Sequence, residues 1–175
     1  MDQLIYNKVI RYANNEDLEW AKHLINRVLS SFYKSDHFAR AQYIFDQFIN
    51  GGKDVFGGSS AGQYIAVAED YLKPAGLIHF VERKKSTINI SLLIVHERFR
   101  GNGVGRSLLS YVEQYAREHG FRNLHCTIAD TNVIALKFLS SNGFSVIGTT
   151  KKRHRRRVVE TSLLCKQVED NACAV

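Results

Sequence analysis

A glycine-rich turn over residues 100–106 has the residue types best suited to chemistry in this chain. It reads Arg-Gly-Asn-Gly-Val-Gly-Arg and lies between an apolar run that ends at Val95 and an amphipathic stretch. Glycine lets backbone N–H groups approach an anion closely, and the N-terminus of a helix adds partial positive charge. Arg100 and Arg106 add two fixed charges. The turn therefore predicts a binding site for a phosphate or pyrophosphate group.

Two common nucleotide-binding motifs do not fit this turn. No Gly-Lys-Ser/Thr follows the glycines, which excludes a P-loop. The glycine spacing differs from that of a dinucleotide-binding fold, and no acidic residue ends a second parallel strand. Taken alone, the turn is also compatible with a tight connection that binds nothing.

A second segment, residues 132–144, lies about thirty residues further along the chain. Together the two segments resemble the signatures of the GNAT N-acetyltransferase family. The acetyl-CoA signature of that family, Arg/Gln-x-x-Gly-x-Gly/Ala, is matched by Arg100, Gly103 and Gly105. Its later signature, Asn-x-x-Ala followed by an aromatic residue and Gly-Phe, is matched by Asn132, Ala135, Phe138, Gly143 and Phe144. The resemblance covers roughly residues 64–166.

The resemblance implies acetyl-CoA as co-substrate and no metal. In the family, the fourth and fifth strands splay apart, helped by a bulge in the fourth, and backbone groups left unpaired there bind the pantetheine chain. Here these residues would be Leu93, Ile94 and Val95, with Leu93 and Val95 as the backbone partners. The implied pyrophosphate contacts are the N–H groups of Arg100, Gly101, Asn102, Gly103, Val104, Gly105, Arg106 and Ser107. Asn132, Ala135 and Phe138 are implied beside the thiol end and the pantetheine arm, although Phe138 also suits core packing.

Direct attack of an amine on the thioester requires a neutral amine, a donor for the carbonyl oxygen and often an acid for the thiolate. The resemblance assigns the donor role to the N–H of Val95. Many relatives carry a tyrosine as the acid directly after the aromatic residue of the second signature, where this chain has Leu139. The departure puts tyrosine assistance in doubt, but water is able to protonate a thiolate.

The general base is the least defined part of the expected site. Thr87, Asn89 and Ser91 alternate with Ile88, Ile90 and Leu92, which predicts one polar face on an otherwise apolar strand. Several relatives carry Glu or His in place of Asn89 or Ser91. Neither residue here is a base at neutral pH, but both can hold a water that relays the proton. On the neighbouring strand, Glu82 is the nearest carboxylate and His79 the nearest imidazole, and Glu82 also suits a solvated charge before a basic turn.

Positive charge is concentrated in one segment of the chain. The net charge is +7, and Lys151, Lys152, Arg153, Arg155, Arg156 and Arg157 contribute six charges within seven residues. Such a cluster favours an anionic partner such as a phosphate-bearing cofactor, an acidic substrate or nucleic acid. A solvated hairpin tip that binds nothing is the competing interpretation.

Composition narrows the class of protein. With 175 residues, 45% of them hydrophobic, the chain is long enough for one domain with a substantial core. No apolar run has the length of a membrane helix, the first twenty residues do not read as a secretory signal, and three widely spaced cysteines imply neither a disulfide framework nor a metal site. We therefore expect a cytoplasmic protein without a membrane partner. Edge strands after the last hairpin often pair in the family that the chain resembles, so the resemblance implies either a monomer or a homodimer.

The elements expected from periodicity form a mixed α/β pattern around a central sheet. They are a strand over 3–12, helices from about 16 and over 36–49, strands over 64–68, 75–83 and 87–95, a helix over 103–120, a strand over 123–129, a helix over 132–142, and strands over 144–150 and 158–166. Turns are expected at Lys73–Pro74 and at 84–86. The resemblance implies a GNAT fold, a mostly antiparallel sheet of six to seven strands flanked by helices. Residues 1–167 are expected to form the single domain and 168–175 a frayed tail.

Three functions are consistent with these features. The first is N-acetylation of a small-molecule amine or amino sugar. The second is acetylation of a protein or a charged tRNA, supported only by the basic cluster, whose binding should then weaken steeply with salt. The third is a module that binds CoA or nucleic acid without turnover, which the missing tyrosine and the missing Glu or His keep open.

Overall fold

The computed structural model describes residues 8–32, 62–83, 86–154 and 157–168. Its elements in chain order are β1 (Lys8–Tyr12), the 3-10 turn η1 (Asn15–Asp17), α1 (Leu18–Phe32), β2 (Gln63–Asp70), β3 (Lys73–Arg83), β4 (Thr87–Val95), the 3-10 turn η2 (Glu97–Phe99), α3 (Val104–Glu118), β5 (Asn123–Ala129), α4 (Val133–Ser141), β6 (Ser145–His154) and β7 (Arg157–Gln167). The helix expected over 36–49 lies outside the described residues.

The strands form one sheet of seven in the order β1-β2-β3-β4-β5-β7-β6. Neighbouring strands are antiparallel except β4 and β5, which run parallel. A parallel pair needs a crossover connection, and α3 provides it. The mixed α/β architecture with a mostly antiparallel sheet is therefore confirmed. Within the described ranges, no helix is both long and apolar enough to cross a membrane.

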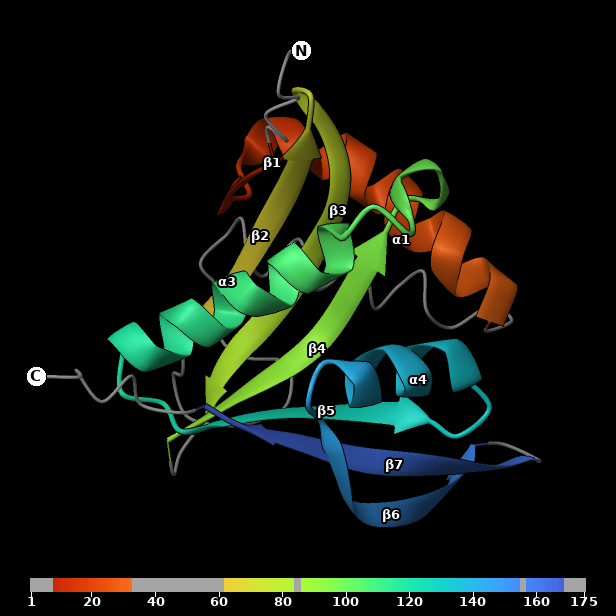
Figure 1. Cartoon of the computed structure of the whole chain (residues 1–175). Coiled ribbons are helices and arrows are strands. Elements are labelled where there is room, and N and C mark those ends of the chain that lie inside the picture. Colours follow the sequence, from red (N-terminus) through yellow and green to blue (C-terminus); the bar gives the residue numbers. More distant parts are fainter. Residues whose placement is uncertain (1–7, 33–61, 84–85, 155–156, 169–175) are drawn as a thin grey trace, which may run out of the picture.

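Two apolar layers cover the opposite faces of the sheet, and Figure 1 shows α1 and α3 on either side of β2 to β4. Even-numbered strand residues such as Ile78, Phe80, Ile88 and Ile90 pack against α3 in the larger layer. The smaller layer lies beneath α1 and is built from Ala21, Leu24, Ile25, Ile65, Val67, Leu77 and Ile94. Because strand side chains alternate between faces, each central strand contributes to both layers. We call the two faces of the sheet the α3 face and the α1 face.

Helix boundaries follow the local signals of the sequence. The side chain of Asn14 accepts the N–H of Glu16, and the carboxylate of Asp17 accepts the N–H of Asn14, so that both ends of a capping box are present before α1. The expected inward face of α3 is confirmed, since Leu108, Leu109, Val112 and Tyr115 are buried.

One turn and two strand boundaries differ from the expectation. The turn between β2 and β3 is Tyr71–Leu72, both at positive φ, whereas Lys73 and Pro74 already belong to β3. The last two strands are longer than expected, because β6 continues to His154 and β7 begins at Arg157. Val168 is buried, and its N–H donates to the carbonyl of Arg122, while the rest of the expected tail lies outside the described residues.

Candidate active site

Strands β4 and β5 pair over only part of their lengths. Thr87 to Ile90 lie beside Asn123 to Cys126, and the ladder ends there, although β4 continues to Val95 and β5 to Ala129. Figure 1 shows the two strands diverging beyond this point. Strand edges without a ladder partner present backbone N–H and C=O groups that need another partner. The divergence, which we call the slot, therefore leaves backbone groups outside the ladder that suit an extended ligand with amide groups.

A β-bulge at Ser91 accompanies the divergence. On β3, Phe80 pairs with Ile90 and the preceding His79 pairs with Leu92, so that Ser91 is an extra residue on β4. A bulge bends its strand and increases the local twist, which helps to direct the end of β4 away from β5. It also breaks the expected alternation, because Leu92 packs on the α1 face while Ile88 and Ile90 pack on the α3 face.

The backbone of Leu93 and Val95 faces the divergence. The N–H of His96 donates to the carbonyl of Ala75 on the β3 side at 2.8 Å. Hydrogen-bonding direction alternates along an antiparallel strand, so Ile94 also faces β3, whereas Leu93 and Val95 face the opposite edge. The carbonyl of Val95 accepts Nε of Arg100 at 3.2 Å. The N–H of Val95 is thus the polar group that this residue presents to the slot.

The glycine turn begins α3 without a side-chain cap. Gly101 and Gly103 have φ of 80° and 79°, a backbone region that costs other residues strain. Gly103 is the N-cap and provides no side-chain hydrogen bond to the first turn. The first N–H groups of a helix have no intrahelical partner, so they are available to an anion. The expected pyrophosphate residues therefore lie on a suitable backbone arrangement.

Three elements converge where this turn meets the slot. A Cβ on Gly105 would lie 3.1 Å from Cζ of Phe138 and 3.6 Å from Cγ2 of Val95. The start of α3, the end of β4 and the middle of α4 therefore touch, and a side chain at position 105 would crowd the junction. Asn132 caps α4, because its Oδ1 accepts the N–H of Ala135 at 3.2 Å. The second signature thus holds α4 against the start of α3.

The position at which relatives carry a tyrosine faces the core in this chain. Leu139 is buried with Phe144 in the layer beneath α3. A leucine cannot protonate a thiolate. Cys126 is also buried, and burial raises the pKa of its thiol to about 12, which suits an apolar packing residue rather than a nucleophile.

Polar side chains cross the α1 face beside the slot. Nδ2 of Asn89 donates to Oγ of Ser91 at 3.1 Å, and Nε2 of the buried His79 lies 3.3 Å from Oε1 of Gln63. His125 on β5 is the register partner of Asn89 and lies on the same face, because Leu124 and Cys126 face α3. We call Gln63, His79, Asn89, Ser91 and His125 the polar row. Sequence reasoning missed Gln63 and His125, although both are polar residues within apolar strands.

Glu82 lies on the other face of the sheet. Its carboxylate accepts the hydroxyl of Tyr115 on α3 at 2.7 Å and the N–H of Gly62 at 3.2 Å. Burial and hydrogen bonds to Tyr64 and Glu82 raise the pKa of Tyr115, so its phenol stays a neutral donor. Glu82 is therefore half-buried and bonded rather than solvated, and the structure does not bring it together with Asn89 and Ser91.

Lys8 is a third residue that sequence reasoning missed. Its Nζ donates to the carbonyl of Asn102 in the glycine turn, 94 positions away along the chain. A contact between β1 and this turn leaves no local signal in the sequence.

Among the residues that the structure describes, no group of three His, Cys, Asp or Glu side chains is placed to hold a metal ion.

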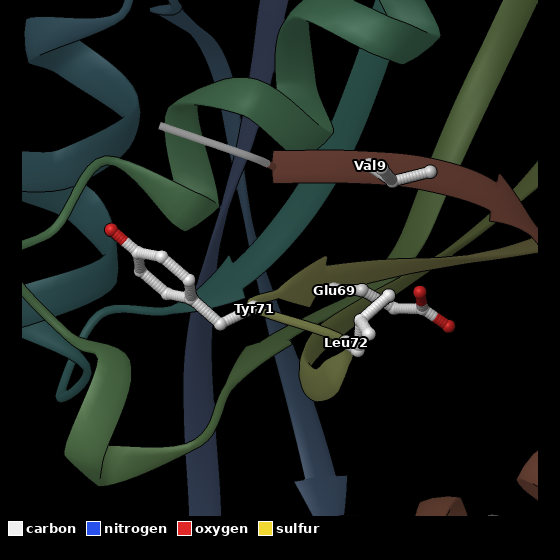
Figure 2. A pocket seen from close by; sticks show the side chains of 4 residues that line it. All are labelled: Val9, Glu69, Tyr71 and Leu72. Atoms are coloured by element: carbon white, nitrogen blue, oxygen red, sulfur yellow. The ribbon is translucent and has the colours of Figure 1, made fainter. Parts of the chain in front are cut away.

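A surface pocket lies apart from this region, at β1 and the β2–β3 hairpin. It is lined by Val9, Glu69, Tyr71 and Leu72, with Tyr71 pointing away from Leu72 and Glu69 (Figure 2). Its lining residues are not among those expected at the site.

Solved structures share this architecture. A GNAT-family protein from Desulfovibrio desulfuricans superposes with a TM-score of 0.73 at 19% identity, over 93% of this chain and 99% of that one. The ribosomal-protein-S18-alanine N-acetyltransferase from Escherichia coli gives 0.69 at 14%, over 96% and 98%. The protein yncA from Salmonella typhimurium, solved with its cofactor acetyl-CoA, gives 0.68 at 19%, over 97% and 98%. At these identities the likeness establishes the fold.

Comparison of the sequence with models of protein families identifies the family of this chain. A comparison with curated proteins gives no match. The model of the acetyltransferase (GNAT) family matches residues 21–144, which is more than half of the chain. This span includes β4, the glycine turn and the second signature. The chain therefore belongs to the GNAT acetyltransferase family.

Proposed function

We propose that this protein transfers an acetyl group from acetyl-CoA to the primary amine of a small molecule or amino sugar, by direct attack in a ternary complex. The observation that carries the proposal is the continuity of two features, the β4–β5 divergence and the uncapped glycine turn. A slot lined by backbone amides leads directly to a cluster of helix N-terminal N–H groups. This order of groups matches a pantetheine chain that ends in a pyrophosphate.

In this proposal the cofactor is held mainly by backbone groups. Leu93, Ile94 and Val95 line the pantetheine, and the N–H groups of residues 100–107 bind the pyrophosphate. Asn132, Ala135 and Phe138 border the pantetheine arm from α4. The fit depends on Gly103, whose φ of 79° would strain any side chain, and on Gly105, where a Cβ would lie 3.1 Å from Cζ of Phe138.

Acetyl-CoA supplies the activated acetyl group, and residues of β4 favour its transfer. The N–H of Val95 would donate to the carbonyl oxygen as negative charge develops there, a kind of stabilisation that is often the largest single contribution to catalysis. Its own carbonyl is held by Arg100, which fixes the orientation of this part of the strand. With Leu139 in the core, we propose that water returns a proton to the departing thiolate.

We propose that the ammonium form of the acceptor passes its proton to bulk solvent through a water held by Asn89 and Ser91, which leaves the neutral amine to attack the thioester. Their mutual hydrogen bond places an amide and a hydroxyl together beside the slot, and both can bind water as donor and acceptor. Glu82 is left out of this role because it is bonded to α3 on the other face. This proton transfer would take place on the α1 face, from which the acceptor would approach.

The acceptor class is tested by CoA release from acetyl-CoA against small amines, amino sugars, polyamines, peptides and charged tRNA, each at low and moderate salt. We expect turnover on a small amine that changes little with salt. Turnover only on a polyanionic acceptor, lost as salt rises, would contradict the proposed class and favour a role for Lys151–Arg157. Acetyl-CoA binding without turnover on any acceptor would favour a non-catalytic module.

A further inference from the structure

We infer that Lys8 is a positioning residue that orients the glycine turn for phosphate binding. The inference rests on the proposed function, since it concerns the same cofactor. Lys8 belongs to β1, which pairs with β2 in register, so its backbone is fixed by the sheet and not by the turn. Its Nζ nevertheless donates to the carbonyl of Asn102.

The side chain of Lys8 reaches across the Asn102–Gly103 peptide. A Cβ built on Gly103 would lie 3.2 Å from Nζ of Lys8, so the ammonium lies directly beside that glycine. The positive φ at position 103 favours glycine, and the ammonium of a lysine from another strand lies beside that glycine. This contact connects the edge strand of the sheet to the turn that would receive the pyrophosphate.

The geometry of the peptide unit gives this contact a consequence for binding. The described peptide bonds are not cis, and in a trans peptide the C=O and the N–H point in opposite directions. Because Lys8 holds the carbonyl of Asn102, the N–H of Gly103 is directed away from Lys8. A hydrogen bond from an ammonium to a carbonyl is stronger than one between neutral groups, so it opposes rotation of the peptide.

Such an orienting contact matters most between flexible residues. Gly101 and Gly103 flank Asn102, and glycine populates more backbone conformations than any other residue. A rotated Asn102–Gly103 peptide would present a carbonyl oxygen, instead of an N–H, on the side away from Lys8. Fixing the peptide before binding removes that alternative and reduces the entropy lost when an anion binds. Lys8 thus acts through the backbone, with its positive charge as a second contribution.

Three variants of Lys8 separate these contributions. Lys8→Met removes both the donor and the charge, Lys8→Gln keeps a neutral donor, and Lys8→Arg keeps both. The matched control is Lys22→Met, which removes the same charge from α1, on the other face of the sheet, where Lys22 pairs with the exposed Glu19. Dissociation constants for acetyl-CoA and for S-acetylpantetheine, which lacks the pyrophosphate, are measured by NMR titration, and thermal unfolding verifies the folding of each variant.

We expect Lys8→Met to weaken acetyl-CoA binding about ten-fold, as loss of one charge-assisted hydrogen bond and of preorganisation implies. Binding of S-acetylpantetheine should stay within about two-fold of the unchanged protein, as should acetyl-CoA binding by Lys22→Met. Lys8→Arg should retain most of the affinity and Lys8→Gln an intermediate value. In the unliganded Lys8→Met protein, the amide resonance of Gly103 should broaden because the peptide exchanges between orientations.

Several results would overturn the inference. Acetyl-CoA affinity in Lys8→Met equal to that of Lys22→Met would show that the contact has no role, while the proposed function would stand. Equal losses for acetyl-CoA and S-acetylpantetheine would indicate a general disturbance of the fold. Failure of the unchanged protein to bind acetyl-CoA would instead contradict the proposed function itself.

Discussion

The proposed cofactor side and the proposed acceptor side of β4 draw on different parts of the chain. The proposed cofactor side consists of backbone groups of residues 93–95 and 100–107, which are nearly consecutive. The proposed acceptor side is the polar row, whose side chains come from β2, β3, β4 and β5. Backbone groups are retained whatever the side chain is, provided that the backbone can adopt its conformation. The cofactor side should therefore be sensitive to added side chains, and the acceptor side to removed ones.

The largest expected effect is on the cofactor side, from Gly103→Asp. The substitution introduces a side chain at φ 79°, 3.2 Å from Lys8 Nζ, and a negative charge where phosphate would bind. We expect the affinity for acetyl-CoA, measured by calorimetry, to fall at least about 100-fold, since both backbone orientation and charge oppose the anion.

The matched control for this change is Gly120→Asp. Gly120 has a similar φ of 73°, and a Cβ there meets no atom within 4 Å. Both variants should lose a similar stability, about 1 kcal/mol, because both place a non-glycine residue in the left-handed region. Equal affinities for acetyl-CoA in the two variants would show that the glycine turn is not the pyrophosphate site.

The acceptor side should respond in the opposite way, through turnover. Asn89→Ala and Ser91→Ala each remove one of the two groups that would hold the relaying water. We expect each variant to lower kcat by about 10- to 100-fold. A positioned proton-transfer group contributes roughly 10²–10⁴-fold, and each single variant leaves the other water-holding group in place. The dissociation constant of acetyl-CoA should change less than about two-fold. Unaltered kcat in the double variant would exclude this pair from the reaction.

A smaller effect tests whether Glu82 stabilises the fold or takes part in catalysis. Glu82→Gln weakens the hydrogen bond from Tyr115 and the one from Gly62. We expect the free energy of unfolding to fall by about 1–2 kcal/mol, with kcat unchanged. A double-mutant cycle with Tyr115→Phe should show coupling between the two residues. A large loss of kcat at unchanged stability would indicate that Glu82 takes part in catalysis after all.

The smallest expected effect concerns the ion pair of Arg11 and Asp17, which lies on neither side of β4 and serves as a reference for stability. Asp17 is buried, which by itself raises its pKa, but hydrogen bonds from Arg11 and from the N–H of Asn14 outweigh burial and lower it. Its contribution to stability is therefore complete above its unfolded pKa, about 3.9, and is lost as pH falls through the lower folded value.

Replacement of Arg11 tests this acid dependence. Arg11→Met removes the partner and should cost on the order of 1 kcal/mol near neutral pH. The difference in unfolding free energy between this variant and the unchanged protein, followed by urea titration, should narrow as pH drops below about 4. A difference that stays constant from neutral pH to below that value would exclude Asp17 as the responsible group.

Much of the fold was predictable because its signals are local. Asn14, Asn132 and Gly143 mark helix ends by capping or by positive φ, and β4 and β5 have the boundaries that residue alternation predicted. The predicted element boundaries were wrong where a local sequence signal competed with strand pairing. Pro74 suggested a turn, but it is the second residue of β3, near the end of the sheet. The expected strand ended at residue 150, but pairing with β7 extends β6 to His154.

By itself, the sequence indicated the family of this protein and supplied the residues of the proposed cofactor side. Its two signatures act through caps, glycine conformations and helix N-termini, which depend on residues a few positions apart. Only the tertiary structure decided the arrangement of the proposed acceptor side, because the bonding of Glu82 to α3 and the register of His125 with Asn89 arise from contacts between distant segments. The bulge at Ser91 and the reach of Lys8 to Asn102 are likewise tertiary features, and they belong to the proposed cofactor side. The physical reason is that a strand pattern assigns side chains to two faces but does not say which helix covers each face. Burial against that helix then separates a structural carboxylate from a polar row that can serve a substrate.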